Sequence, residues 1–176
     1  GKTMPWPVRY ADLEPWYGQA ETLFGVHGQA GDDPTEPPRS APYPHAPIPH
    51  EPIIGKAFER MRALGLHPFH MPSAVDLHPG GTCIRCGTCD AFPCRVGAKG
   101  DAETRLIDPA LKHPNVTLQT GSEVTRLIAD ERGKRIIAAQ YRRDGKELSV
   151  SARLFVLSAG AINSAALLLR SADTRN

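Results

Sequence analysis

A proline-rich segment over residues 32–52 constrains the fold of this chain more than any other feature. Its eight prolines are Pro34, Pro37, Pro38, Pro42, Pro44, Pro47, Pro49 and Pro52. Each ring removes a backbone N–H and disfavours helix in the residue before it, which excludes a regular helix or an interior strand. The segment therefore predicts an ordered arm or a linker lying over the surface, after a helical first segment of residues 1–31.

Apolar residues at helical spacing predict helices on both sides of this arm. The first follows Asp12, a favourable N-cap residue, and ends at Gly25. Its apolar face consists of Leu13, Trp16, Tyr17, Ala20 and Phe24. A second helix has Ile54, Ala57, Phe58, Met61 and Leu64 on one face. It ends at Gly65, and a third helix is capped by Asp101 and runs toward Pro114, so that residues 53–114 combine helices with a cysteine-rich loop.

Residues 115–176 follow the spacing of strands instead. Short apolar or β-branched runs at 116–119, 123–129, 135–141, 148–151 and 154–158 are divided by turn residues, and Asp144-Gly145 predicts a hairpin. Residues 154–157 are apolar throughout, as in an internal parallel strand covered on both faces. They lead through a glycine turn into a helix at 161–171. The predicted fold class is α/β (α+β mixed), with a β-meander and one doubly wound strand-turn-helix element.

Charge and length restrict the classes of partner. The chain has 176 residues, room for one ordinary domain, and a formal net charge of +2 from 21 Lys+Arg and 19 Asp+Glu that are evenly spread. The sequence shows no cluster of positive charge that would attract nucleic acid. No apolar run approaches the ~20 residues that cross a bilayer. The first residue is Gly1 and the last stretch is polar, so we expect both natural ends to lie elsewhere.

All four cysteines lie in one loop, as Cys83-x2-Cys86-x2-Cys89-x4-Cys94. Flanking glycines let several sulfurs converge on one centre, and soft thiolates suit an iron–sulfur cluster or zinc. The match to a ferredoxin run is partial, because the last gap has four residues and Pro93 precedes Cys94. Disulfides that staple the loop, or free thiols, are the alternatives, and since disulfides persist in oxidising compartments the localisation stays open.

The turn Ser158-Ala159-Gly160 is a second candidate site. A glycine between strand and helix lets a backbone approach a ligand closely, and the helix N-terminus offers free N–H groups to an anion such as a pyrophosphate. The same turn also occurs in α/β proteins without any cofactor contact.

Three stretches of the chain resemble one enzyme family. Residues 156–164, Val-Leu-Ser-Ala-Gly-Ala-Ile-Asn-Ser, with Leu-Leu-Leu-Arg-Ser at 167–171, resemble the second signature of glucose-methanol-choline flavoproteins. Residues 6–17 resemble the stretch that enters the family's substrate-side region, and 115–127 resemble the strand pair before its meander. The loop at 89–102 is similar to that of bacterial sugar and polyol dehydrogenase flavoprotein subunits, some of which carry an iron–sulfur centre and deliver electrons to a cytochrome.

This resemblance implies part of an FAD/NAD(P)-binding-like domain in an enzyme that oxidises a CH–OH group of an alcohol or sugar by hydride transfer to FAD. It implies contact of the Val124 backbone with the FAD adenine, and of Ser158, Ala159 and Gly160 with its ADP half. Ala165 and Ala172 depart from the signature, which usually has Pro and Gly there. An iron–sulfur cluster would be held by Cys83, Cys86, Cys89 and Cys94.

The parts needed for catalysis are not among these motifs. The chain has no Gly-x-Gly-x-x-Gly fingerprint and no match to the family's late His pair, and none of its seven histidines falls in a family motif. We therefore expect no catalytic residue here, with the missing parts of the same enzyme as partners. The alternatives are a stand-alone iron–sulfur or zinc module without flavin, or a fragment whose missing strands come from another chain.

Overall fold

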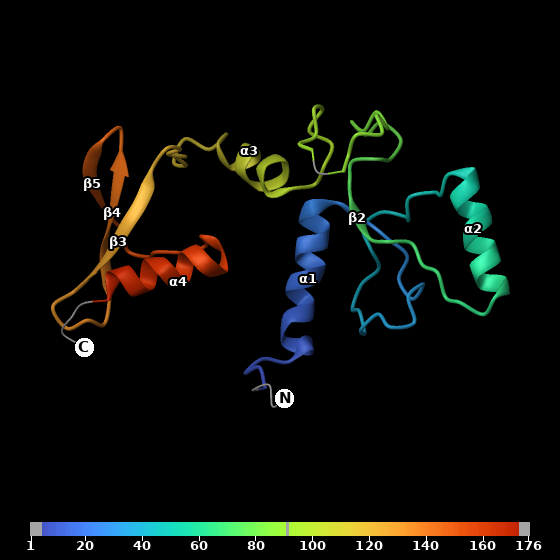
Figure 1. Cartoon of the computed structure of the whole chain (residues 1–176), viewed down its shortest axis with the longest axis horizontal. Coiled ribbons are helices and arrows are strands. Elements are labelled where there is room, and N and C mark those ends of the chain that lie inside the picture. Colours follow the sequence, from blue (N-terminus) through green and yellow to red (C-terminus); the bar gives the residue numbers. More distant parts are fainter. Residues whose placement is uncertain (1–4, 91, 173–176) are drawn as a thin grey trace. The chain divides into compact units, whose positions relative to one another are not determined.

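The computed structural model describes residues 5–90 and 92–172 (Figure 1). The chain divides into two compact units, Gly1–Val116 and Thr117–Asn176. In the described part of the chain, none of the helices has both the length and the apolar character that crossing a membrane requires.

The first unit opens with helix α1, Tyr10–Phe24. The helix ends as predicted at Gly25, whose φ of 65° places it in the left-handed region that glycine tolerates best. Its start differs from the prediction, because Asp12 lies inside the first turn. There its Oδ2 accepts the Arg9 N–H at 2.9 Å, so Arg9 becomes the N-cap. Asp12, three residues after the N-cap Arg9, still stabilises this end of the helix through that hydrogen bond.

The proline-rich segment is an ordered arm that is fastened to α1. The Arg39 guanidinium pairs with the carboxylate of Glu21 on the helix and, at 3.2 Å, with that of Glu36. Closer to the helix start, Glu14 Oε1 accepts the Ser40 N–H at 2.8 Å. These contacts with Glu14 and Glu21 of α1 hold the arm in place, although the arm forms none of the named β-strands.

The rest of this unit consists of short elements. Helix α2 (Pro52–Ala63) buries Phe58, and strands β1 (Val26–His27) and β2 (Ser73–Ala74) pair antiparallel. A π-helical turn, η1 (Glu103–Ile107), continues into α3 (Asp108–Ala110). Asp101 caps this stretch as predicted, since its Oδ1 accepts the Thr104 N–H at 2.9 Å. The cysteine-rich loop lies between β2 and η1.

The second unit is a β-meander covered by one helix. Strands β3 (Glu123–Ala129), β4 (Ile136–Arg143) and β5 (Lys146–Ser151) pair antiparallel in that order, and α4 (Gly160–Ser171) packs on β3. The hairpin turn between β4 and β5 is at Asp144-Gly145 as predicted, both with φ in the left-handed region (49° and 71°). Leu127 and Ala139 are cross-strand partners, and with Leu167 of α4 they form the core.

The parallel strand predicted at residues 154–158 does not form, and neither does the strand at 116–119. Leu154 and Val156 are 78% and 80% exposed, whereas Phe155 and Leu157 pack against the core. A parallel strand requires a hydrogen-bonded neighbour, and the strands described in this unit pair only with one another. The mixed helix-and-sheet class and the meander are confirmed, whereas burial of this segment on both faces is wrong.

Candidate functional site

The turn before α4 presents an open backbone in the second unit. Ser158, Ala159 and Gly160 are all exposed. Gly160 has a φ of 76°, and a Cβ placed on it would meet no heavy atom within 4 Å. The Ala159 N–H donates to Ser164 Oγ at 3.1 Å, which ties the turn to the first residues of the helix. An exposed turn at the N-terminus of a twelve-residue helix fits the approach of an anionic group.

The fourth residue predicted to contact FAD lies elsewhere in this unit. Val124 is the second residue of β3, pairs with Tyr141 of β4 and is 40% exposed. It belongs to the sheet, whereas the other three belong to the turn before α4. Contact of Val124, Ser158, Ala159 and Gly160 with FAD remains a prediction.

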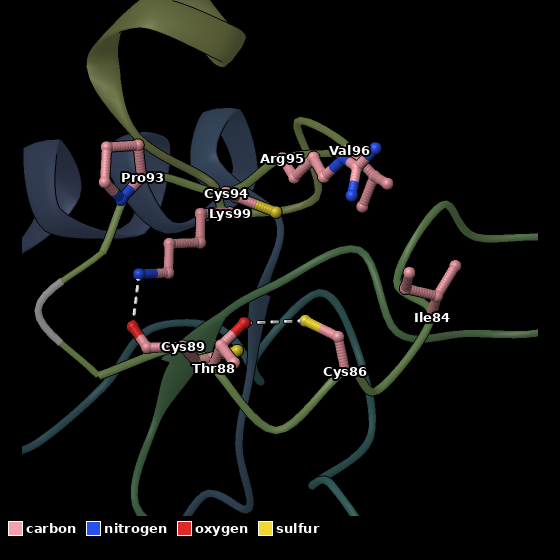
Figure 2. Close-up of a pocket in the computed structure, with 9 residues that line it drawn as sticks. All are labelled: Ile84, Cys86, Thr88, Cys89, Pro93, Cys94, Arg95, Val96 and Lys99. Atoms are coloured by element: carbon pink, nitrogen blue, oxygen red, sulfur yellow. Dashed lines mark hydrogen bonds between the residues drawn. The ribbon is translucent and has the colours of Figure 1, made fainter.

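The cysteine loop of the first unit encloses a cavity of about 200 Å³ (Figure 2). The cavity is lined by Ile84, Cys86, Thr88, Cys89, Pro93, Cys94, Arg95, Val96 and Lys99. Cys83 instead lines a larger hollow of about 700 Å³, and Cys89 lines both the cavity and this hollow. The loop thus gathers three of its four thiols around one small cavity.

Hydrogen bonds to two of these sulfurs favour the thiolate form. Cys86 Sγ and the Thr88 hydroxyl lie 3.3 Å apart, and their hydrogen bond is the main cause that lowers the pKa of the Cys86 thiol. Cys94 Sγ accepts the Ala98 N–H at 3.2 Å, and this bond, joined by other backbone N–H groups, lowers the pKa of the Cys94 thiol.

Lys99 fastens the two sides of the loop together. Its ammonium donates to the carbonyl oxygen of Cys89, as Figure 2 shows. It also donates to the carbonyl oxygen of Phe92, at 2.6 Å. These two bonds hold the backbone between Cys89 and Cys94 against Lys99. Lys99 and Arg95 both line the cavity.

The described residues do not bring all four cysteines together around one point. In residues 5–90 and 92–172, no group of three or more His, Cys, Asp or Glu side chains is placed so that it could hold a metal ion. Cys83 lies outside the cavity that the other three line, so four sulfurs do not converge on one point. Ligation by Cys83, Cys86, Cys89 and Cys94 remains a prediction that a metal assay would decide.

The structure also groups histidines that the sequence pattern did not connect. The rings of His27 and His45 stack at 4.8 Å, and those of His45 and His78 at 5.4 Å. A separate pair, His50 and His70, stacks at 4.4 Å. The partners come from segments far apart in the chain, so no spacing in the sequence could have indicated them.

The comparisons with known proteins extend over the whole chain. The chain is 37% identical to the 6'''-hydroxyparomomycin C oxidase of Streptomyces lividus over 97% of its length, and 35% identical to the paromamine 6'-oxidase of Streptomyces fradiae over 99%. It is 27% identical to the gluconate 2-dehydrogenase flavoprotein of Pantoea cypripedii over 93%. These matches cover 32%, 32% and 30% of the relatives, so the chain spans about a third of their length.

Residues 69–175 match the sequence pattern of the GMC oxidoreductase family. This range contains the cysteine loop, the meander and the turn before α4. It confirms the glucose-methanol-choline resemblance, with sugar dehydrogenase flavoproteins among the relatives. The chain belongs to the GMC oxidoreductase family.

Proposed function

We propose that this chain is part of an FAD-dependent oxidoreductase that oxidises a CH–OH group of a sugar or another alcohol. The family match over residues 69–175 carries the proposal, because GMC oxidoreductases are flavoproteins. FAD would accept a hydride from the carbon that bears the hydroxyl. The chain would contribute structure around that cofactor.

Carbohydrates are the substrate class that the relatives favour. Two relatives are named as oxidases of paromamine and of 6'''-hydroxyparomomycin C, and two as gluconate and fructose dehydrogenases. The oxidases share 35–37% of residues with this chain and the two dehydrogenases 27%. We therefore propose an amino sugar of the paromamine kind as the first substrate to test, ahead of a simple sugar or sugar acid.

The turn at 158–160 would lie beside the ADP half of FAD, with the Val124 backbone at the adenine. Support comes from the exposed turn, the open space at Gly160 and the free N–H groups at the start of α4. The helix dipole there also favours a negative group such as the pyrophosphate. Binding of a ligand at this exposed turn would require no movement of the core formed by Leu127, Ala139 and Leu167.

A charge placed in this turn tests the proposed contact. Ala159→Asp adds a carboxylate at an exposed position where the helix dipole accommodates it, so the fold is retained. We expect the Kd for FAD to rise about tenfold, the effect of a repulsion of roughly 1–2 kcal/mol between surface charges. Ala159→Asn has nearly the same shape without the charge and should bind FAD as the unchanged protein does.

The measurement is a titration of apoprotein with FAD, followed by flavin fluorescence, on the protein that contains this segment. Equal Kd values for the Asp and Asn variants would contradict a position of the turn beside the pyrophosphate. Far-ultraviolet circular dichroism of both variants separates loss of binding from loss of fold.

Substrate choice is tested by anaerobic reduction of bound flavin. Paromamine should reduce the flavin faster than fructose or gluconate does. Faster reduction by fructose or gluconate would assign the protein to the sugar-dehydrogenase side of the family. For such an enzyme a cytochrome is the proposed electron acceptor, to be tested by its reduction in the same mixture.

A further inference from the structure

Three imidazole rings meet where the proline-rich arm is attached to β1. The ring of His45, in the arm, stacks on that of His27 in β1 at 4.8 Å and on that of His78 at 5.4 Å. The backbones are joined at the same place. The Gly28 N–H donates to the His45 carbonyl at 3.1 Å, and the His45 N–H donates to the Val26 carbonyl at 3.3 Å. We call the rings of His27, His45 and His78 the histidine stack.

The contacts within the histidine stack suit uncharged rings. His27 is only 4% exposed, and its Nδ1 donates to the Ala46 carbonyl at 2.7 Å. Its Nε2 is buried and has no hydrogen-bond partner among the described residues, so a proton on this nitrogen would have no acceptor. His45 is partly buried, and a proton on its ring would place a positive charge against two imidazoles.

The charged groups that face His45 compensate only partly for such a proton. Asp76 is close enough to favour it, but the Asp76 Oδ1 is already paired with His78 Nε2 at 2.8 Å. Arg105, from η1, is a permanent cation that opposes a second positive charge. Burial is the main cause that lowers the pKa of the His45 imidazole below its ordinary 6.5, and His27 and His78 lower it further.

We propose that the histidine stack is a pH-sensitive switch, in which protonation of the His45 ring by solvent detaches the arm from β1. A histidine whose pKa is lowered in the folded state stabilises that state above its ordinary 6.5, and this stabilisation is lost as the pH falls. The first half of the arm stays attached to α1. Hydrogen bonds from Ser40 lower the pKa of the Glu14 carboxyl below its ordinary 4.5, so this contact persists in mild acid.

Hydrogen exchange of single amides in the full chain, at pH 7.5 and 5.5, tests the switch. After correction for the intrinsic effect of pH on exchange, the protection factor of the Gly28 amide should fall several-fold. About tenfold is the limit for one group that ordinarily titrates at 6.5. The Ser40 amide, whose acceptor is Glu14, should keep its protection. Unchanged protection of the Gly28 amide, or equal loss at both amides, would overturn the proposal.

Two variants separate His45 from the other histidines. His45→Phe keeps a ring in the stack that takes no proton, so the protection factor of the Gly28 amide should be the same at both pH values. His67→Phe is the matched control, because His67 is exposed and lies outside the ring stacks of the described residues. It should respond to acid as the wild type does. An acid response of His45→Phe as large as that of the control would contradict the role of His45.

A further measurement needs no substitution. The ring protons of His45 can be followed by nuclear magnetic resonance in the wild-type chain as the pH is lowered. We expect a titration midpoint below 6.5, together with loss of the Gly28 protection over the same range. A midpoint at or above 6.5 would refute the proposal.

Discussion

Ser171 couples the helix of the second unit to its sheet, and its replacement gives a sharp prediction. Its Oγ accepts the Leu127 N–H at 2.8 Å and donates to the Leu167 carbonyl at 2.6 Å. β3 is an edge strand of the meander, and Leu127 and Leu167 are both core residues. One hydroxyl therefore accepts a backbone N–H of this edge strand beside the core.

We expect Ser171→Ala to lower the free energy of unfolding of the second unit by about 1–2 kcal/mol. A buried N–H left without an acceptor costs about 1–3 kcal/mol. The higher helix propensity of alanine returns at most about 0.5 kcal/mol in the last turn of α4. The Leu167 carbonyl loses little, because a carbonyl is satisfied more easily than an N–H group.

Two measurements check this prediction. Urea unfolding followed by circular dichroism gives the free energy, and hydrogen exchange of the Leu127 amide reports the bond itself. Ser149→Ala, an exposed serine on β5, is the control and should change stability by less than about 0.5 kcal/mol. Equal stability of the two variants, or unchanged protection of the Leu127 amide, would refute the role given to Ser171.

Three further outcomes are expected from the same structure. Leu167→Ala should cost about 2–4 kcal/mol in urea unfolding, because the side chain is 4% exposed in the core; a loss under about 1 kcal/mol would contradict that packing. Gly145→Ala should cost about 1–2 kcal/mol, since its φ of 71° is unfavourable for a residue with a Cβ, and unchanged stability would argue against this turn. Hydrogen bonds from the His70 backbone and ring lower the pKa of the Asp32 carboxyl below its ordinary 3.8. The ionised Asp32 therefore stabilises the folded state above pH 3.8, and this stabilisation is lost as the pH falls further and the carboxylate is protonated. Asp32→Asn should weaken that acid dependence in urea titrations across this range, and an unaltered pH profile would refute it.

Features set by local chemistry were predictable from the sequence. The end of α1 at Gly25 and the hairpin at Asp144-Gly145 both depend on residues that tolerate left-handed backbone. Asp101 was recognised as a cap because its carboxylate bonds within its own turn. Such features need no information about distant parts of the chain.

Features set by distant partners were not predictable. Residues 154–158 have the composition of a buried strand, but composition does not supply the neighbouring strand that would pair with them. The cysteine spacing indicated that sulfurs would converge, but it did not indicate which cysteines would line the same cavity. The cavity of about 200 Å³ is lined by Cys86, Cys89 and Cys94, whereas Cys83 lines the larger hollow.

The most direct test of the proposed function is the visible absorbance of the purified protein that contains this segment, recorded without oxygen before and after addition of paromamine. We expect the absorbance of bound FAD before addition, and its bleaching as the sugar hydroxyl is oxidised. A protein that binds no FAD, or whose bound FAD is reduced by none of paromamine, fructose and gluconate, would contradict the proposal of FAD-dependent carbohydrate oxidation.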